Sequence, residues 1–228
     1  MMLVLLLACE GPAGAPAPED SAGREANAPL HFRWPLANPT GFYQTTGVDH
    51  DPEVHPPGIE SAICTNYDGR SFPWCYDEHK GSDFLMDGGF EKMDAGSEPI
   101  LAAADGVVVE IADGNYDRCH AADAGIDCDG HDQVANYVII EHRGGWRTKY
   151  WHMKSGSVEV AVGADIACGD TLGHVGSSGN SSLPHLHFQV ESAAEDVIDP
   201  YAGENTQPES WWVDQGDPEG FPGMDCAE

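Results

Sequence analysis

Short runs of apolar and β-branched residues, separated by turns that contain glycine and aspartate, recur along the chain and predict an all-β fold. The runs are 98–104, 107–111, 134–142, 146–153, 158–162, 165–167, 171–175 and 185–190. Asp105-Gly106 between two apolar runs predicts a β-hairpin, and Gly144-Gly145 predicts a second one. No long stretch has the apolar spacing of a helix. The pattern predicts a compact antiparallel β-sheet domain, barrel- or sandwich-like, with long loops and few helices.

The last run, 185–190, carries two histidines and follows a glycine- and serine-rich stretch, 173–182. Side chains alternate between the two faces of a strand, so His185 and His187 project to the same side and the apolar residues to the other. Two neighbouring imidazoles can serve as one metal ligand and one acid–base group. Taken alone, the same pattern is equally typical of two surface histidines.

Two further clusters contain residues suited to a metal site. His79 and Asp83 lie four positions apart, and Gly81 between them permits a turn that brings both side chains toward one point. An imidazole and a carboxylate suit Zn²⁺, although a surface turn with an ion-paired aspartate is the alternative. His152 lies near the end of the run 146–153. A hydrolytic zinc site needs three protein ligands, an open position and groups that exchange protons, but spacing alone does not assign these roles.

Taken in chain order, these motifs resemble those of the lysostaphin-type (LytM-type) zinc endopeptidases of bacterial cell walls. The resemblance rests on His79-x-x-x-Asp83, on Tyr150-Trp151-His152-Met153 and on His185-Leu186-His187. It extends through 98–107, 136–138 and 173–179 and closes at Asp199-Pro200, so that it covers residues 30–201. The ordered set of motifs is far more specific than any one of them.

The resemblance implies one Zn²⁺ ion, held by His79, Asp83 and His187. It implies that His152 and His185 act as general base and as hydrogen-bond donors to the oxyanion. It also implies a zinc endopeptidase that cuts the cross-links or stem peptides of peptidoglycan. Two alternatives remain open, namely a non-catalytic module that binds cell walls or activates an amidase, and a zinc peptidase acting on glycine-rich exported proteins.

The charge composition excludes one class of binding partner. The 228 residues include 10 Lys and Arg against 39 Asp and Glu, giving a formal charge of −29. Such a chain repels a phosphate backbone, which excludes a nucleic-acid partner.

The N-terminal segments predict export. Residues 1–9 are apolar, too short to span a bilayer, and end in Leu6-Leu7-Ala8-Cys9, which resembles a lipobox with Cys9 as the lipidated residue. The alternative is a plain secretory signal. Residues 10–29, rich in Ala, Pro and acidic residues, predict a disordered tether. The protein is thus expected in the bacterial cell envelope, with possible membrane anchoring through this lipid, or secreted.

Six cysteines remain after Cys9, and an even number in an exported chain predicts disulfides. They are Cys64, Cys75, Cys119, Cys128, Cys168 and Cys226. Fifteen connectivities are possible. Short separations favour Cys64–Cys75 and Cys119–Cys128, and Cys168–Cys226 then follows by elimination.

Two segments depart from the family pattern. The acidic insert 112–133 contains His120 and His131, so a second metal site is conceivable there, but a surface loop closed by a disulfide is the favoured interpretation. Residues 202–228 form an acidic tail with Trp211 and Trp212, which we expect to pack on the domain.

Overall fold

The structure is a computed structural model that describes residues 30–55 and 62–227. Cys9 and the predicted tether lie outside these residues. The strands are β1 Phe42–Thr46, β2 Ser82–Met86, β3 Pro99–Leu101, β4 Gly106–Ala112, β5 His120–Ala122, β6 Gly125–Asp127, β7 Tyr137–Glu141, β8 Arg147–Trp151, β9 Asp165–Ile166, β10 Thr171–His174, β11 His185–Glu191 and β12 Val197–Ile198. Helix α2 spans Gly89–Gly96, and two 3₁₀ turns span Pro39–Gly41 and Arg143–Gly145. None of the described helices is both long enough and apolar enough to cross a membrane.

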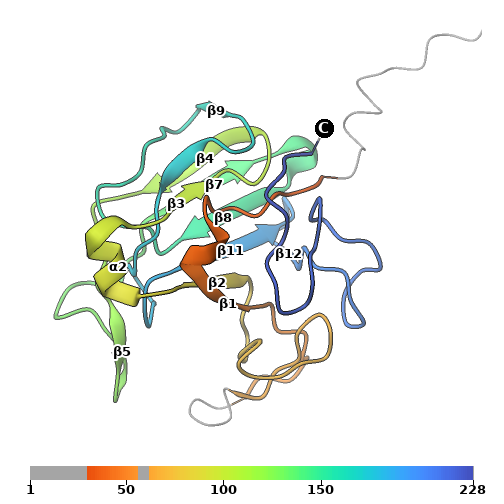
Figure 1. Cartoon of the computed structure of the whole chain (residues 1–228), viewed down its shortest axis with the longest axis horizontal. Helices are drawn as coiled ribbons and strands as arrows, with labels where there is room; N and C mark the ends of the chain where they lie inside the picture. The colour runs from red at the N-terminus through yellow and green to blue at the C-terminus, as the bar shows by residue number, and fades with distance from the viewer. Residues whose placement is uncertain (1–29, 56–61, 228) are drawn as a thin grey trace, which may run out of the picture.

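One large antiparallel sheet organises the domain (Figure 1). Its strand order is β1-β2-β11-β8-β7-β4-β9, and β12 pairs with β11. β3 and β10 form a separate two-stranded sheet, and so do β5 and β6. The expected all-β antiparallel fold with few helices is confirmed. The central position of β11 matters most, because it places the His185–His187 strand between β2 and β8.

The core lies on one face of the large sheet, opposite the histidines. Leu186 and Phe188 of β11 are fully buried, as the alternation along the strand predicts. Phe188 packs edge-on against Tyr150 of β8 and against Phe32 from the N-terminal segment. Burying a side chain of this size stabilises the fold by about 1.5–3 kcal/mol. The apolar half of β11 therefore fixes the orientation of its polar half.

The second predicted hairpin is confirmed, because β7 and β8 pair antiparallel around the Arg143–Gly145 turn. The first is wrong. β3 ends before Asp105 and β4 begins at Gly106, but β3 pairs with β10 while β4 pairs with β7 and β9. Residues 102–105 carry the chain from one sheet to the other, and Ala102 to Ala104 among them are buried. The expected strand at 158–162 is also wrong, since β9 begins only at Asp165.

Three disulfides join the cysteines in the pairs that sequence separation favoured. They are Cys64–Cys75, Cys119–Cys128 and Cys168–Cys226. The last one ties the C-terminal segment to the β9–β10 turn. That segment packs on the core, where Trp212 is 2% exposed and Phe221 stacks on Trp34. Residues 202–227 are thus part of the folded body.

Candidate metal centre

Three neighbouring strands carry polar side chains to one end of the large sheet. On β11 and β2, His187 lies directly opposite Asp83, and on β8 it lies opposite Trp151. His185 projects from the same face of β11, two residues earlier. His79 arrives from the loop that precedes β2, and His152 follows directly after β8. All five predicted residues are 4–6% exposed.

His79, Asp83 and His187 converge on one point. His187 Nδ1 lies 2.8 Å from Asp83 Oδ1, and His79 Nε2 lies 3.2 Å from each of these atoms. A tetrahedral zinc ion with ligand bonds of about 2.0–2.1 Å holds its ligand atoms about 3.3 Å apart. Within residues 30–55 and 62–227, these three residues are the one group with the geometry to hold a metal ion.

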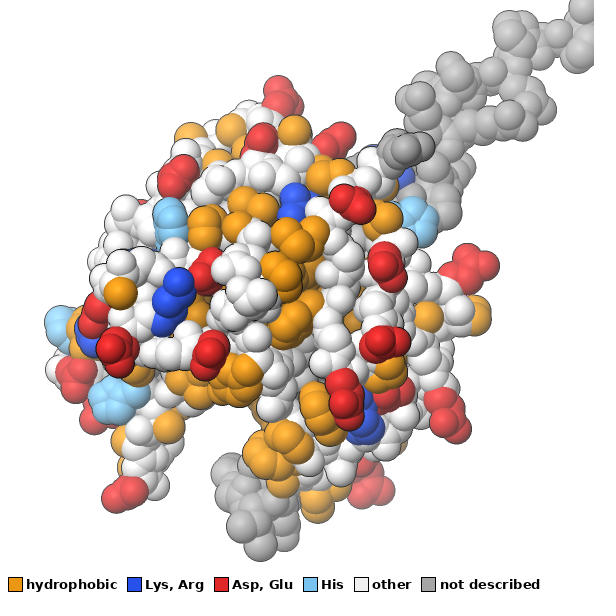
Figure 2. All heavy atoms as spheres, in the orientation of Figure 1, with side chains coloured by type: hydrophobic (Ala, Val, Ile, Leu, Met, Phe, Trp, Pro, Cys, Tyr) orange, Lys and Arg blue, Asp and Glu red, His pale blue; other side chains and the backbone are white. Residues whose placement is uncertain are grey.

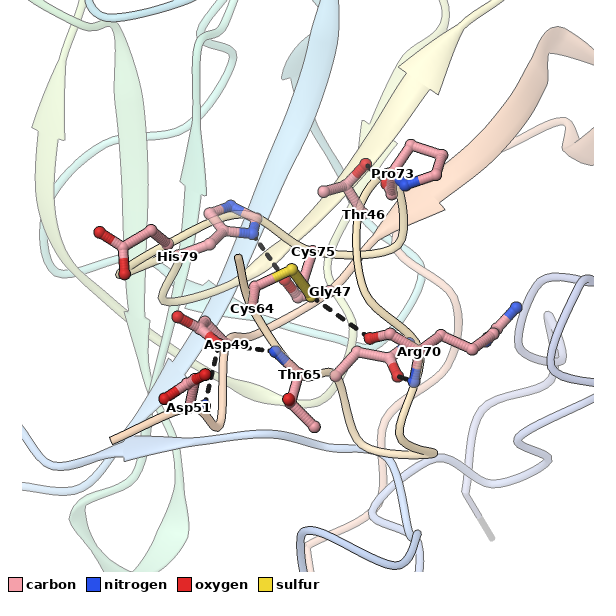
Figure 3. The surroundings of a disulfide bond; sticks show 12 residues. Thr46, Gly47, Asp49, Asp51, Cys64, Thr65, Arg70, Pro73, Cys75 and His79 are labelled. Carbon is pink, nitrogen blue, oxygen red and sulfur yellow. Dashed lines mark hydrogen bonds between the residues drawn. A yellow bond between two sulfur atoms is a disulfide. The ribbon is translucent and has the colours of Figure 1, made fainter. Parts of the chain in front are cut away.

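His79 is oriented by the backbone of an adjacent loop. Its Nδ1–H donates to the carbonyl oxygen of Gly47 at 2.7 Å, which leaves Nε2 as the atom directed at Asp83 (Figure 3). The N–H of Gly47 in turn donates to the carbonyl of Trp74, next to Cys75 of the first disulfide. Gly81 leaves room for the His187 ring beside this turn, because a Cβ at position 81 would lie 2.7 Å from His187 Nε2.

His187 is oriented by its own strand. Its Nε2–H donates to Gln189 Oε1 at 3.3 Å, and Gln189 Nε2 donates to Glu191 Oε2, which is paired with Lys149. Trp151 stacks on the imidazole from the neighbouring strand. Because His79 and His187 each give one ring N–H to a fixed acceptor, two nitrogen lone pairs and a carboxylate oxygen face one another. A divalent cation fits this donor set.

His152 and His185 lie side by side next to this group, with ring centroids 4.6 Å apart. His152 Nδ1–H donates to the carbonyl of Ser178 at 2.7 Å, and His185 Nδ1–H donates to that of Leu183 at 2.7 Å. His185 Nε2 lies 3.5 Å from Asp83 Oδ1. Both rings thus hold Nδ1–H toward the backbone and leave Nε2 for the site.

The backbone of His152 is unusual. Its φ angle of 66° lies in the left-handed region, which is uncommon for a residue with a Cβ. The following residue, Met153, is held on both sides, since its N–H donates to Asn136 O and its carbonyl accepts from Asn136 Nδ2 and Ser178 Oγ. Strain of this kind persists where neighbouring contacts enforce it, and it is common at functional sites.

The charges within the site are strongly coupled. Burial opposes the ionised form of Asp83, but His79 and His185 outweigh burial and hold the pKa of this carboxyl well below its usual range. Burial, reinforced by His185 and His187, lowers the pKa of His152 well below its usual value. Burial also lowers the pKa of His187, whereas in His185 the effect of Asp83 exceeds that of burial and raises the pKa.

Tyr76 is a site residue that sequence reasoning missed. It stacks on the imidazole of His79, with ring centroids 4.2 Å apart, and its hydroxyl lies 3.4 Å from Asp83 Oδ2. Burial, together with Asp83, raises the pKa of this phenol, so it stays protonated. Its position beside Cys75 of the disulfide-closed loop was the available signal, because that loop leads directly into His79.

The insert contains no second cluster of metal ligands among the described residues. His131 stacks on Tyr116, and His120 Nδ1 contacts the carbonyl of Arg118. Within the insert, Cys119–Cys128 closes the β5–β6 hairpin, as the favoured interpretation held.

Comparison with known proteins shows the family to which the chain belongs. The sequence model of peptidase family M23 matches residues 77–200, which is more than half of the 228 residues. The chain belongs to peptidase family M23. The matched range contains all five clustered residues, and the lysostaphin-type resemblance expected from the motifs is confirmed.

Several M23 relatives are named after peptidases. Peptidoglycan DD-endopeptidase ShyA of Vibrio cholerae is 28% identical over 112 residues, covering 49% of this chain and 20% of that protein. Glycyl-glycine endopeptidase ALE-1 of Staphylococcus capitis is 32% identical over 111 residues, covering 49% and 24%. The crystallised lysostaphin catalytic domain of Staphylococcus simulans is 25% identical, with a TM-score of 0.41, covering 69% of this chain and 89% of that domain. This chain spans less than a quarter of the length of either of these two full-length relatives.

Proposed function

We propose that the protein is a zinc-dependent endopeptidase that hydrolyses peptide bonds in the cross-links or stem peptides of peptidoglycan. The observation that carries the proposal is the convergence of three ligand atoms beside two further histidines. In each of the four histidines one ring nitrogen is held by a protein acceptor, while the other faces the site.

In this proposal His79, Asp83 and His187 hold one Zn²⁺ ion. The ion supplies Lewis acidity, which polarises a peptide carbonyl and makes water acidic near neutral pH. The protein's own part is to keep the three ligand atoms in place, through the acceptors Gly47 O and Gln189 Oε1. Outer partners of this kind typically contribute 10- to 100-fold to metal affinity.

His152 and His185 are the proposed proton-transfer residues. Their Nε2 atoms lie on the side of the rings away from the carbonyls that hold Nδ1. One ring can take a proton from the attacking water, and the other can donate a hydrogen bond to the developing oxyanion. Positioned groups of this type contribute about 10²- to 10⁴-fold to the rate.

The substrate proposal is supported by the names of the M23 relatives and by the position of the site. His79 comes from the loop 47–81, and the loop that fixes His152 and His185 is bonded to the β5–β6 hairpin. The hairpin projects from the lower left of the molecule (Figure 2). A peptide substrate that reaches the five side chains would therefore pass next to these two loops.

The same proposal places the protein outside the cytoplasm. Three disulfides are typical of exported proteins. Peptidoglycan as substrate requires the cell envelope or the medium. Lipidation of Cys9, which lies outside the described residues, remains part of the proposal.

The test uses the full chain with its disulfides intact. Purified protein loaded with zinc should release new amino groups from isolated peptidoglycan, and a chelator should abolish the release. His187→Ala should abolish both zinc binding and activity. Activity that persists in the chelated protein and in His187→Ala would show that these residues do not form the working site.

A matched control removes a histidine that lies outside the cluster. His174, at the end of β10, is a partly buried histidine outside the cluster. His174→Ala should leave zinc content and turnover unchanged. Cleavage of glycine-rich polypeptides in preference to peptidoglycan would overturn the substrate assignment while leaving the peptidase assignment in place.

A further inference from the structure

The β5–β6 hairpin is bonded along its length to the loop that precedes β11. The N–H of Cys119 donates to the carbonyl of Ser177 at 2.9 Å, and the N–H of Ser177 donates to the carbonyl of Asp117 at 3.2 Å. Farther along, the N–H of Ala121 donates to the carbonyl of Ser182 at 3.0 Å. The hairpin thus holds residues 177–182 by backbone bonds at both ends.

Buried hydroxyls continue this connection toward His185. Ser177 Oγ donates to the carbonyl of Cys119 at 2.7 Å and lies 2.8 Å from Ser181 Oγ. Ser181 Oγ donates to the carbonyl of Leu183 at 2.9 Å and lies 3.2 Å from His185 Nδ1. Both serines are at most 1% exposed. Leu183 O is the acceptor that holds His185 Nδ1–H, so this chain of bonds runs from the hairpin to one proposed proton-transfer residue.

The same loop, residues 177–183, also orients His152, the other proposed proton-transfer residue. Ser178 directly follows Ser177, and its carbonyl accepts from His152 Nδ1–H. Its side chain is fixed as well, because Ser178 Oγ donates to Met153 O and accepts from the N–H of Asn136. Any displacement of residues 177–178 therefore changes the orientation of the His152 ring.

The hairpin needs its cross-link. Its two strands are three residues long, and their side chains are largely exposed. An isolated two-stranded hairpin of this size is marginal in water. Cys119 and Cys128 are instead buried at its base, where Cys128 Sγ approaches the carbonyl of Gly179 at 3.7 Å. The disulfide thus fixes the same residue, Cys119, whose N–H bonds to the carbonyl of Ser177.

We infer that the disulfide-closed hairpin 117–128 is a positioning element that sets the orientation of His152 and His185 through Ser177 and Ser181. The inference rests on the proposed function for the role of the two histidines. It assigns the acidic insert a part in the chemical step and none in metal binding. Besides the loop 177–183, the insert bonds to Asp94, Asn136 and the 155–156 turn, and none of these contacts involves His79 or Asp83.

The experiment compares two disulfide variants of the full chain. Cys119→Ser/Cys128→Ser should lower kcat by about 10- to 100-fold, since small misplacements of catalytic groups have effects of this size. Its KM and its zinc content, measured on the purified protein, should stay close to the wild type. Cys168→Ser/Cys226→Ser is the matched control, because it opens the disulfide of the C-terminal segment and should lower stability with kcat unchanged.

A double-mutant cycle tests the route. If the hairpin acts through Ser177, then Ser177→Ala should lower kcat, and adding it to the hairpin variant should have little further effect. Full additivity of the two effects would overturn the route. An unchanged kcat in the hairpin variant, an equal loss in the control, or a loss of zinc would each overturn the inference.

A readout without turnover separates this inference from the proposed function. Nitrogen NMR of the imidazoles should show Nδ1–H tautomers for His152 and His185 in the wild type, and a mixture of tautomers in Cys119→Ser/Cys128→Ser. If the wild type cuts no peptidoglycan, the proposed function fails, while the tautomer shift still supports the hairpin as the element that orients the two rings. Identical tautomers in both proteins would overturn it.

Discussion

Two segments beside the site, 64–75 and 119–128, are each closed by a disulfide, but they support different residues of the site. Cys64–Cys75 closes a loop whose neighbouring carbonyl, Trp74 O, holds Gly47 and through it the metal-ligand candidate His79. Cys119–Cys128 closes a hairpin whose backbone holds Ser177, next to the carbonyl that orients His152. The sequence separations, 11 and 9 residues, are nearly equal.

The difference teaches that the contribution of a disulfide is decided by the hydrogen bonds next to it. The described parts of the loop 47–81, residues 47–55 and 62–81, are further organised by Asp49. Its carboxylate accepts from the N–H of Thr65 (Figure 3) and from the N–H of Glu78. Glu78 has a φ of 60°, and it directly precedes His79. One segment therefore supports the placement of His79, and the other supports the orientation of His152.

For this comparison, the largest expected effect comes from removing a proposed proton-transfer residue. His152→Ala should lower kcat by about 10²- to 10⁴-fold, because it removes a positioned acid–base group. Zinc content should remain near one ion per chain, since His79, Asp83 and His187 are untouched. Steady-state turnover and metal analysis on the same sample check this. Loss of the ion from His152→Ala would show that the two segments do not support separate functions.

The next effect concerns the loop 47–81. Cys64→Ser/Cys75→Ser should weaken zinc binding by about 10- to 100-fold, since it loosens the partner of a metal ligand. At saturating zinc its kcat should approach that of the wild type, the reverse of the result expected for the hairpin variant. Competition with a chelator gives the affinity. A kcat deficit that excess zinc does not restore would count against the comparison.

A smaller change tests ligand support without touching either loop. Gln189→Leu removes the acceptor of His187 Nε2–H and should weaken zinc binding by about tenfold. Gln215→Leu is the control, because the Gln215 amide bonds to the backbone of Ala202 in the C-terminal segment, away from the five clustered residues. Equal zinc affinities for Gln189→Leu and the wild type would remove Gln189 from the site.

The smallest effect concerns stability in the sheet, away from both segments. Burial lowers the pKa of His142, whose ring lies between Asp105 O and Thr148 Oγ1. The unfolded chain therefore binds this proton more readily, so stability is present above pH of about 6.5 and is lost as pH falls below it.

The loss should reach at most about 1.4 kcal/mol per pH unit below that value. Urea unfolding between pH 8 and pH 5 measures it as the difference between the wild type and His142→Gln, in which the titrating group is absent. Parallel pH profiles for the two proteins would show that His142 titrates normally.

Much of the site could be predicted from sequence because its chemistry is concentrated in short motifs. The alternation of β11 placed His185 and His187 on one face, and Leu186 and Phe188, which point to the other face, are buried as expected. The turn at Gly81 was also a local signal. The support for these residues could not be predicted, since Gly47, Ser178 and Leu183 act through backbone carbonyls, which any residue type provides.

What the sequence determined by itself was therefore the all-β class, the five polar residues and the β7–β8 hairpin, all of which follow from patterns within a few residues of one another. Only the tertiary structure decided that β3 and β4 separate into different sheets and that Tyr76 lies against His79. It also decided that the insert supports residues 177–182. The physical reason is that hydrogen bonds between distant backbone groups depend on how the strands pack and leave no mark in local composition.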